Sequence, residues 1–350
     1  MPVSQRTYGI TASGETVTEF TLTNRHGYEA RILDYGCTLT HFFVPTARGK
    51  LDIVLGYDDL ASYEAGTASH GALIGRYANR LEGSRFSIDG HEYLLPANEG
   101  CNHLHGTLSK TMFEGEGKGE AVASFRAVSP AGDDGFPGNL DLLITCTLTA
   151  ADALIFDFRA KTDAPTHVNL TAHTYWNLAG AGSGTILGHV MTMGSSSFLE
   201  CNSESCPTGI ITSVVGTPLD FRTTAPISQG LPPRHPYLKR TGGYDHCFLL
   251  EDGAPFAAKV YCPSTDLTLE LATTQPAMQF YTGNHLDEDP VPGKGGVFYP
   301  KWGGFALEPQ HYPCSPTHPS FPSTLLRPGA LYHEVAAFHV SSGRGESQTL

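Results

Sequence analysis

The fold is decided by the stretch Arg85-Phe86-Ser87-Ile88-Asp89-Gly90-His91-Glu92-Tyr93-Leu94-Leu95. Two runs of alternating character flank the Asp89-Gly90 pair, and alternation at period two is the pattern of a strand with one buried face. Asp-Gly between two such runs predicts a type I′ turn, because both central residues need a positive φ. The stretch therefore predicts an antiparallel hairpin.

The same strand pattern recurs outward from the hairpin in both directions. On the N-terminal side, residues 16–45 contain strands such as Thr18–Thr23 and Ala30–Leu33, followed by one helical turn at 58–63. On the C-terminal side, strand patterns cover residues 122–128, 140–149, 153–161, 165–178, 186–193, 247–250, 256–262, 267–273, 277–281 and 331–340. Helical periodicity longer than two turns is absent, so we predict an all-β fold.

Composition agrees with this prediction. The 350 residues include 39 glycines and 24 prolines, and only 16% are charged, which suits short strands joined by tight turns. No internal repeat and no change of composition divides the chain. We therefore expect a single domain over residues 1–340, followed by a flexible, polar C-terminal tail over residues 341–350.

The charge and the cysteines limit the possible partners and the location. The net charge is -13 and no basic run is present, which argues against nucleic-acid binding and suits a small polar ligand such as a sugar. No apolar run is long enough to span a membrane, and Met1–Arg6 does not open a signal peptide. The eight cysteines are scattered without a Cys-x-x-Cys pair, which favours free thiols and a cytoplasmic protein.

One carboxylate is placed conspicuously, in Gly303-Gly304-Phe305-Ala306-Leu307-Glu308-Pro309-Gln310-His311-Tyr312-Pro313. Glu308 ends an apolar run and directly precedes a proline. Because proline cannot donate to a sheet ladder, we expect the strand to end here with Glu308 at its mouth. Glu308 is then either a solvated acid at a strand end or a catalytic carboxylate.

Two groups of histidines are candidates for chemistry. On a strand, His103 and His105 would share one face, at a spacing that also occurs in metal sites. A third ligand at suitable spacing is missing, since the nearest downstream acid is Glu114, so we expect no metal. His173, which lies between polar and aromatic residues, is either a satisfied core histidine or a catalyst.

Further polar residues stand in unusual places. Asp245 follows Gly242-Gly243-Tyr244, where a flexible backbone can bring its carboxylate close to a ligand. Gln279 lies inside an apolar strand, and a buried amide needs partners.

No nucleophile elbow, phosphate-binding loop or dinucleotide fingerprint is present. The candidate residues that remain are His, Glu, Asp, Asn, Arg and aromatic residues, and these suit acid–base chemistry on a polyhydroxylated molecule.

Taken together, these segments resemble the aldose 1-epimerase (galactose mutarotase) family over nearly the whole chain. The resemblance rests on motifs in the family's order, namely Gly75–Arg80, Asn102–Gly106, Asp134–Leu140, Asn169–Gly180, Pro218–Arg222, Gly243–His246, Gln279–Asn284 and Leu307–Gln310. The chain departs from the family pattern at Thr107, over residues 108–114 and at Tyr175-Trp176. These departures concern sugar preference more than the reaction.

The resemblance implies a large antiparallel β-sandwich that interconverts the α and β anomers of hexoses such as galactose and glucose. It implies Glu308 as the base, His173 as the acid and His105 as a hydrogen-bond donor near the ring oxygen, with no metal and no cofactor. The sugar hydroxyls would be bound by Asn79, Arg80, Tyr175, Asp245 and Gln279. Ordinary pKa values of about 4.3 for Glu and 6.5 for His suggest that modest shifts hold each group in its working form near neutrality.

Three other functions remain open on sequence alone. Asp245 and Glu308 could be the carboxylate pair of a glycosidase. A sugar-binding protein without turnover would not require His173 and Glu308. A phosphosugar epimerase of the same superfamily could use Arg76, Arg80 and Arg85 to bind a phosphate.

Overall fold

The structure is a computed structural model that describes residues 2–251 and 253–343. Strands make up most of its regular secondary structure, and every strand ladder in the described part is antiparallel. The α-helices of the described residues are α1 (Leu60–Ala65) and α2 (Pro236–Thr241). With six residues each, these helices are too short and too polar to cross a membrane. The predicted all-β class is confirmed.

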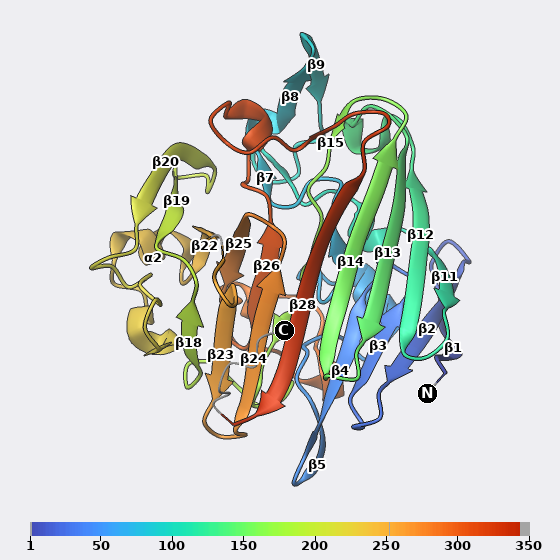
Figure 1. Ribbon diagram of the computed structural model, residues 1–350, viewed down its shortest axis with the longest axis vertical. Helices are drawn as coiled ribbons and strands as arrows, with labels where there is room; N and C mark the ends of the chain where they lie inside the picture. The colour runs from blue at the N-terminus through green and yellow to red at the C-terminus, as the bar shows by residue number, and fades with distance from the viewer. Residues whose placement is uncertain (1, 252, 344–350) are drawn as a thin grey trace.

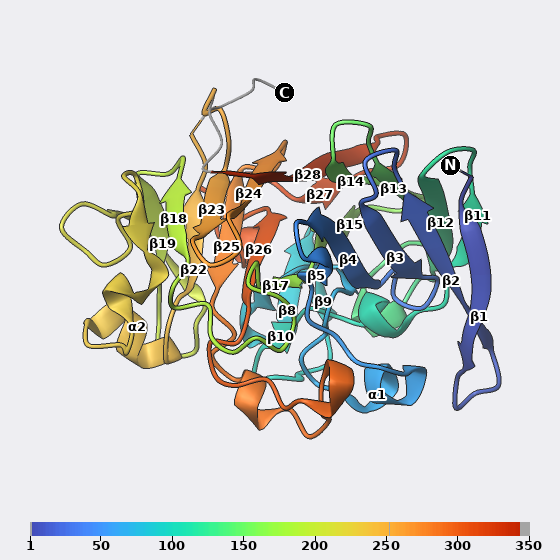
Figure 2. The same cartoon turned by 90° about the horizontal axis from the view of Figure 1, so that it is seen from below.

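Two layers of sheet form the body of the protein (Figures 1 and 2). One layer is a nine-stranded sheet with the order β11 (Glu114–Gly117), β12 (Val122–Ser129), β13 (Leu140–Leu148), β14 (Ala153–Thr162), β28 (Tyr332–Ser342), β24 (Leu267–Thr273), β23 (Ala258–Cys262), β18 (Val190–Met193) and β21 (Ala225–Pro226).

The second layer consists of two sheets side by side under the nine-stranded sheet, as Figure 2 shows. The five-stranded sheet runs in chain order through β1 (Ser4–Ile10), β2 (Thr16–Thr23), β3 (Glu29–Leu33), β4 (Leu39–Thr46) and β5 (Gly49–Asp52). The six-stranded sheet has the order β17 (Tyr175–Trp176), β26 (Phe305–Gln310), β25 (Ala277–Tyr281), β22 (Asp245–Leu249), β19 (Ser197–Cys201) and β20 (Pro207–Ser213).

The remaining sheets of the described residues are short two-stranded ladders. They pair β6 (Leu73–Ile74) with β16 (Thr171–Ala172), β7 (Arg80–Leu81) with β10 (His103–Leu104), β8 (Arg85–Ile88) with β9 (His91–Leu94), and β15 (Thr166–His167) with β27 (Leu325–Leu326). The β8–β9 ladder is the predicted hairpin, with Ile88 opposite His91. Asp89 and Gly90 have φ angles of 53° and 83°, as a type I′ turn requires.

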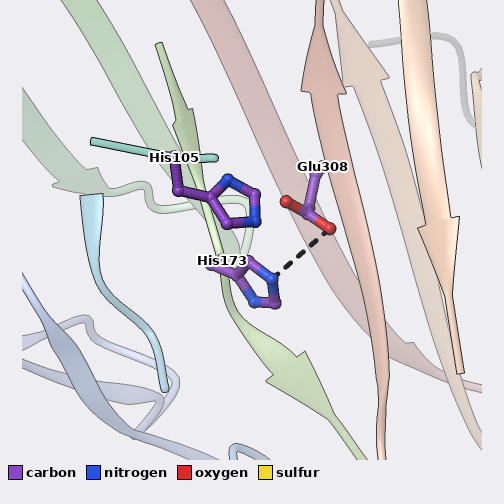
Figure 3. A group of neighbouring side chains, drawn as sticks. All are labelled: His105, His173 and Glu308. Carbon is purple, nitrogen blue, oxygen red and sulfur yellow. Dashed lines mark ion pairs between the residues drawn. The ribbon is translucent and has the colours of Figure 1, made fainter. Parts of the chain in front are cut away.

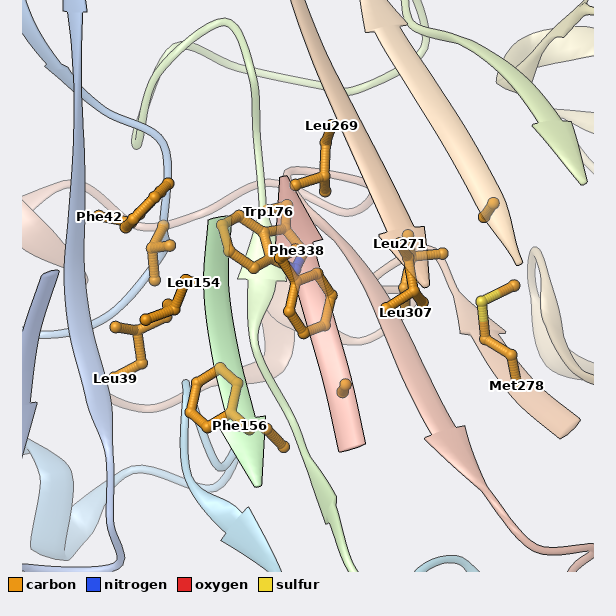
Figure 4. Close-up of a cluster of buried hydrophobic side chains, with 14 of the residues drawn as sticks. Leu39, Phe42, Leu154, Phe156, Trp176, Leu269, Leu271, Met278, Leu307 and Phe338 are labelled. Carbon is orange, nitrogen blue, oxygen red and sulfur yellow. The ribbon is translucent and has the colours of Figure 1, made fainter. Parts of the chain in front are cut away.

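The main hydrophobic core lies between the layers (Figure 4). Phe338 of β28 packs against Trp176 of β17, with ring centroids 5.1 Å apart. On β26, Phe305 and Leu307 belong to this core. Because successive strand residues point to opposite faces, Ala306 and Glu308 point away from it, toward the outer face of the six-stranded sheet.

Two sequence predictions differ from the structure in detail. The segment predicted as one strand over 165–178 is broken into β15, β16 and β17, each two residues long, because it pairs in turn with β27, β6 and β26. Of the predicted C-terminal tail 341–350, Ser341 and Ser342 belong to β28, and residues 344–350 lie outside the described residues.

Candidate active site

Glu308 lies in the middle of β26 and not at the end of a strand, so the predicted position at a strand mouth is wrong. The strand continues through Pro309, which lies opposite Met278 of β25. On its other side, β26 pairs with β17 only at Phe305 and Ala306. At Pro309, β26 therefore pairs only with β25. A proline, which lacks an N–H to donate, is tolerated there as it is on an edge strand.

The ladder places the polar candidates side by side on the outer face. Glu308 is opposite Gln279, and Gln279 is in turn opposite Cys247 of β22. Asp245, two residues before Cys247, shares that face, and its Oδ1 accepts a 2.6 Å hydrogen bond from Nε2 of Gln279. Oε1 of Gln279 is buried and has no partner in the described residues, so it is an acceptor available to a ligand.

His173 faces Glu308 from the short segment between β16 and β17 (Figure 3). Its backbone is fixed by two 2.9 Å hydrogen bonds, from its N–H to Ala72 O and from the N–H of Gly71 to its carbonyl. Its Nε2 lies 3.7 Å from Oε1 of Glu308, and the two side chains are only 7% and 2% exposed. Nδ1 of His173 and Oε2 of Glu308 are buried without a protein partner in the described part of the chain.

His105 completes the group beside His173, with ring centroids 5.4 Å apart (Figure 3). It follows β10 in a left-handed conformation with φ 66°. Its Nδ1 accepts a 3.2 Å hydrogen bond from the backbone N–H of Asn79, which is left-handed as well. Asn79 therefore lies next to His105, and its side chain is buried.

His103 does not join the group. The left-handed turn at His105 ends the period-two alternation, so the expectation that the two histidines share a face is wrong. His103 is fully buried, with Nδ1 donating to Pro96 O at 2.9 Å and Nε2 3.2 Å from Oδ2 of Asp134. Its role is structural.

The burial of the three groups shifts their pKa values strongly. Burial, followed by the nearby charge of Asp245, raises the pKa of Glu308 well above its usual value, while Arg80 lowers it. Burial lowers the pKa of His173 to about 4. Burial, with the neighbouring His173 and Arg80, lowers the pKa of His105 well below its usual value. Each shift favours the uncharged form.

These directions differ from the expectation that modest shifts would leave Glu308 ionised and His173 protonated near neutral pH. In the unliganded protein, the favoured form has the proton on Glu308 and a neutral His173. This form and the ion pair differ only by the position of one proton between two neighbouring groups. In either form the pair holds one proton, so the site contains one acid and one base.

The three arginines considered for phosphate binding separate in the structure. Arg80 lies at the site, where its guanidinium forms two 2.6 Å hydrogen bonds with Glu99. Arg76 is buried and donates to Ser129, Pro130, Pro137 and Gly138 of the 129–138 loop. Arg85 lies on the exposed hairpin, 3.9 Å from Glu92. The three arginines left open as phosphate ligands therefore do not form one cluster.

Tyrosines cover one side of the histidine pair. Tyr175 packs on His173 with centroids 4.8 Å apart, and Tyr281 lies 6.0 Å from Tyr175. The sequence analysis missed Tyr281, although its position two residues after Gln279 places it on the same strand face. It also missed His70, which is fully buried behind Tyr175 with centroids 5.0 Å apart, and for which the sequence carries no local signal.

The group formed by His105, His173 and Glu308 also has the composition of a two-histidine, one-carboxylate metal site. The ligand atoms of these three residues all lie within 4.8 Å of one another. If a metal were bound, these residues would hold it. The acid–base chemistry available to the same three groups does not require one.

Comparisons with known proteins agree with this site. The sequence profile of the aldose 1-epimerase family matches residues 18–339. Galactose mutarotase from Rattus norvegicus is 37% identical over 345 residues, which cover 97% of this chain and 98% of that protein. Aldose 1-epimerase from Escherichia coli K12 is 34% identical over 341 residues, 95% of this chain and 97% of that protein.

Solved structures give the same result for the fold. A crystal structure of an aldose epimerase homologue from C. elegans superposes with a TM-score of 0.85 at 30% identity, covering 92% of this chain and 98% of that chain. Galactose 1-epimerase from Lactobacillus acidophilus superposes with a TM-score of 0.87 at 24% identity, covering 97% and 99%. The second likeness concerns the fold alone. Together they confirm the predicted sandwich type.

Proposed function

This chain belongs to the aldose 1-epimerase family and interconverts the anomers of aldoses, and we propose that Glu308, His173 and His105 carry out this reaction on hexoses such as galactose and glucose. The observation that carries the assignment is the buried pair of Glu308 and His173, 3.7 Å apart, with an unpartnered polar atom on each. The reaction requires one group that accepts a proton and one that donates a proton, held close together.

The reaction moves two protons in each direction. The ionised Glu308 takes the proton of the anomeric hydroxyl while protonated His173 gives its proton to the ring oxygen, and the bond between C1 and the ring oxygen breaks. The open-chain aldehyde then rotates about its C1–C2 bond. The ring recloses on the other face of the carbonyl as His173 takes back its proton and Glu308 returns the other to the anomeric oxygen.

After ring opening, Glu308 is protonated and His173 is neutral. This is the form that burial favours in the free protein, so the site stabilises the state in which the open chain is held. The cyclic sugar requires the ion-pair form, which contacts from the substrate must stabilise. A hydroxyl that donates to Oε2 of Glu308, and a sugar oxygen that accepts from Nδ1–H of protonated His173, supply such contacts.

The other polar side chains are proposed to bind the sugar. Asp245 and Gln279 present an acceptor-rich pair joined by a 2.6 Å hydrogen bond. Asn79 and Arg80 lie beside His105, and Tyr175 supplies an aromatic wall next to His173. No cofactor, nucleic acid or membrane takes part in this proposal, and a cytoplasmic location stays a prediction from the sequence.

Polarimetry tests the function directly. Freshly dissolved α-D-galactose and α-D-glucose should approach their equilibrium rotations faster with the purified protein than in buffer. The variant Glu308→Gln keeps the shape of the side chain but cannot accept a proton, so it should lose most of this acceleration. Equal rates with wild type and buffer for both sugars would contradict the proposed substrates, and equal rates for wild type and Glu308→Gln would contradict the proposed base.

A further inference from the structure

Arg80 is held in an unusually rigid way for a residue at the site. Its Nε donates to Oε2 of Glu99 and its Nη2 donates to Oε1, both at 2.6 Å. Two parallel hydrogen bonds fix both the position and the plane of a guanidinium. The Arg80 side chain is 12% exposed, so this pair is mostly withdrawn from solvent on the arginine side.

The backbone of Arg80 is fixed as well. Its N–H donates to Oδ1 of Asn79 at 2.8 Å, and its carbonyl accepts from the N–H of Cys314 at 2.9 Å and from the Cys314 thiol at 3.2 Å. With both ends of the residue fixed, the orientation of the guanidinium depends on Glu99. Within residues 2–251 and 253–343, Nη1 makes no hydrogen bond to the protein, so both of its N–H groups are available to a ligand.

Glu99 itself is held by a rigid loop. It exchanges backbone hydrogen bonds with Asn102, at 3.1 and 2.9 Å. The side chain of Asn98 closes the same loop by bonding both the N–H and the carbonyl of Leu104, at 2.7 and 2.9 Å. The loop leads directly into His105, so Glu99 and a proposed catalytic group share one support.

The charge of the guanidinium also acts on the reacting groups. Burial alone would lower the pKa of Arg80, but the hydrogen bonds of Glu99 and the charge of Asp245 raise it above its usual value. In return, the charge of Arg80 lowers the pKa of Glu308 against the larger effects of burial and Asp245. Arg80 is thus hydrogen-bonded to Glu99 and linked electrostatically to both site carboxylates.

We infer that Glu99 is a positioning residue that holds the Arg80 guanidinium so that Nη1 donates to a hydroxyl of the bound sugar. This inference rests on the proposed function, in which Arg80 binds substrate. Glu99 itself does not need to touch the sugar. Replacing Glu99 should therefore weaken sugar binding, and it should do so only in a protein that retains Arg80.

A double-mutant cycle separates this role from a simple surface ion pair. A hydrogen bond to a charged group contributes about 1.5–3 kcal/mol, so Glu99→Ala should raise KM for galactose by roughly ten- to a hundredfold while kcat changes by less than about threefold. In the Arg80→Ala background, the same change should leave KM unaltered. The matched control is Asp220→Ala, which removes an equally bidentate partner from Arg222 on the surface and should not affect KM.

The pH profile gives a readout that loss of structure alone would not produce. The titratable and charged groups around Glu308 include His105, His173, Asp245, Arg80, Tyr175, Tyr281 and Cys247. Without the negative charge of Glu99, the positive charge of Arg80 is no longer partly neutralised and lowers the pKa of Glu308 further. The acidic limb of kcat/KM should therefore move to lower pH. Glu99→Gln keeps the side-chain shape and should move the limb in the same direction with a smaller rise in KM, which covers the case that Glu99→Ala fails to fold.

Calorimetric titration with galactose distinguishes failure of this inference from failure of the proposed function. If the wild type binds galactose but does not turn it over, the ratio of Kd values for wild type and Glu99→Ala still tests the role of Glu99. Unchanged KM or Kd in both Glu99 variants, with an unchanged acidic limb, would overturn the inference. An equal loss from Glu99→Ala with and without Arg80 would overturn it as well, because Glu99 would then act independently.

Discussion

The backbone N–H of Asn79 points at Nδ1 of His105, 3.2 Å away. A backbone N–H can only donate, so Nδ1 must be the unprotonated nitrogen of the ring. Because the pKa of His105 is lowered well below its usual value by burial, the ring is neutral at physiological pH and carries its proton on Nε2. One backbone contact thus makes His105 a hydrogen-bond donor toward the site.

This tautomer is directly measurable. Long-range ¹H–¹⁵N correlation spectra near neutral pH should show His105 as the Nε2–H tautomer. His189 supplies an internal reference, since its Nε2 accepts from the N–H of Leu178 at 3.1 Å and its proton must lie on Nδ1. A protonated Nδ1 on His105 would exclude its proposed role as a donor through Nε2.

The acid–base pair should behave as a unit. Positioned general acids and bases contribute about 10²–10⁴-fold, so Glu308→Gln and His173→Asn should each lower kcat by about that factor while the sugar still binds. The double variant should be little worse than the worse single variant, because both groups take part in the same proton transfers. Polarimetry at saturating sugar measures this, and multiplicative losses would show that the two groups act in separate steps.

The buried carboxyl of Glu308 should cost stability at neutral pH. In the unfolded chain the group ionises near its ordinary value of 4.5, whereas burial raises the folded-state pKa well above it. Between these two values the folded state binds more protons, so stability is fully present below about pH 4.5 and is lost as the pH rises toward the folded-state pKa.

Glu308→Gln removes this dependence while keeping the shape of the side chain. The variant should therefore gain stability relative to the wild type as the pH rises from 4.5 toward the folded-state pKa, by up to about 1.4 kcal/mol per pH unit. Urea unfolding at several pH values measures the difference. A difference that stays constant with pH would mean that Glu308 titrates normally in the folded protein.

Buried histidines should make the protein sensitive to acid. Burial lowers the pKa to about 4 for His173, about 4 for His167 and about 3 for His246. Between these values and the ordinary 6.5, the unfolded state binds more protons, so stability is present above about pH 6.5 and falls as the pH drops through the folded-state pKa.

Urea unfolding between pH 7 and pH 4 should show this loss before the carboxylates titrate. His167→Gln should flatten the decline, whereas the control His91→Gln, at an exposed position of the hairpin, should leave it unchanged. A decline that is equally steep in His167→Gln and the wild type would contradict the burial argument for His167.

Removal of metal should not abolish activity. The proposed proton transfers use only side chains, although His105, His173 and Glu308 have their ligand atoms within 4.8 Å of one another. Activity should therefore survive prolonged dialysis against EDTA, with metal content followed by elemental analysis. Loss of activity on chelation, restored by one divalent ion, would assign the group as a metal centre.

Local patterns predicted most strands because alternation and turn chemistry depend on neighbouring residues. The β8–β9 hairpin appears as expected since Asp89-Gly90 satisfies its turn without help from the rest of the fold. Glu308 was predicted at the end of a strand, but it lies inside β26. Whether Pro309 ends a strand depends on how far β17 extends beside it, and that is decided by tertiary pairing.

The protonation states could not be predicted from the sequence for a similar reason. The pKa shifts of Glu308 and His173 come mainly from burial, which depends on the layers that cover them. The prediction that His103 shares a face with His105 failed because the left-handed turn falls on His105 itself, and a histidine gives no sequence signal for a positive φ. Glu99 was visible in the sequence, but its partner Arg80 lies 19 positions away, and only the fold brings the two together.

The position of β28 constrains how this protein can be made. This strand, residues 332–342, lies between β14 and β24 near the middle of the nine-stranded sheet, so neither half of that sheet can join the other before β28 is in place. During synthesis, β12, β13 and β14 emerge long before the strand that must cover the open edge of β14. The nascent chain therefore exposes an unpaired strand edge until residues 332–342 have been synthesised, and this interval is when chaperone binding should matter most.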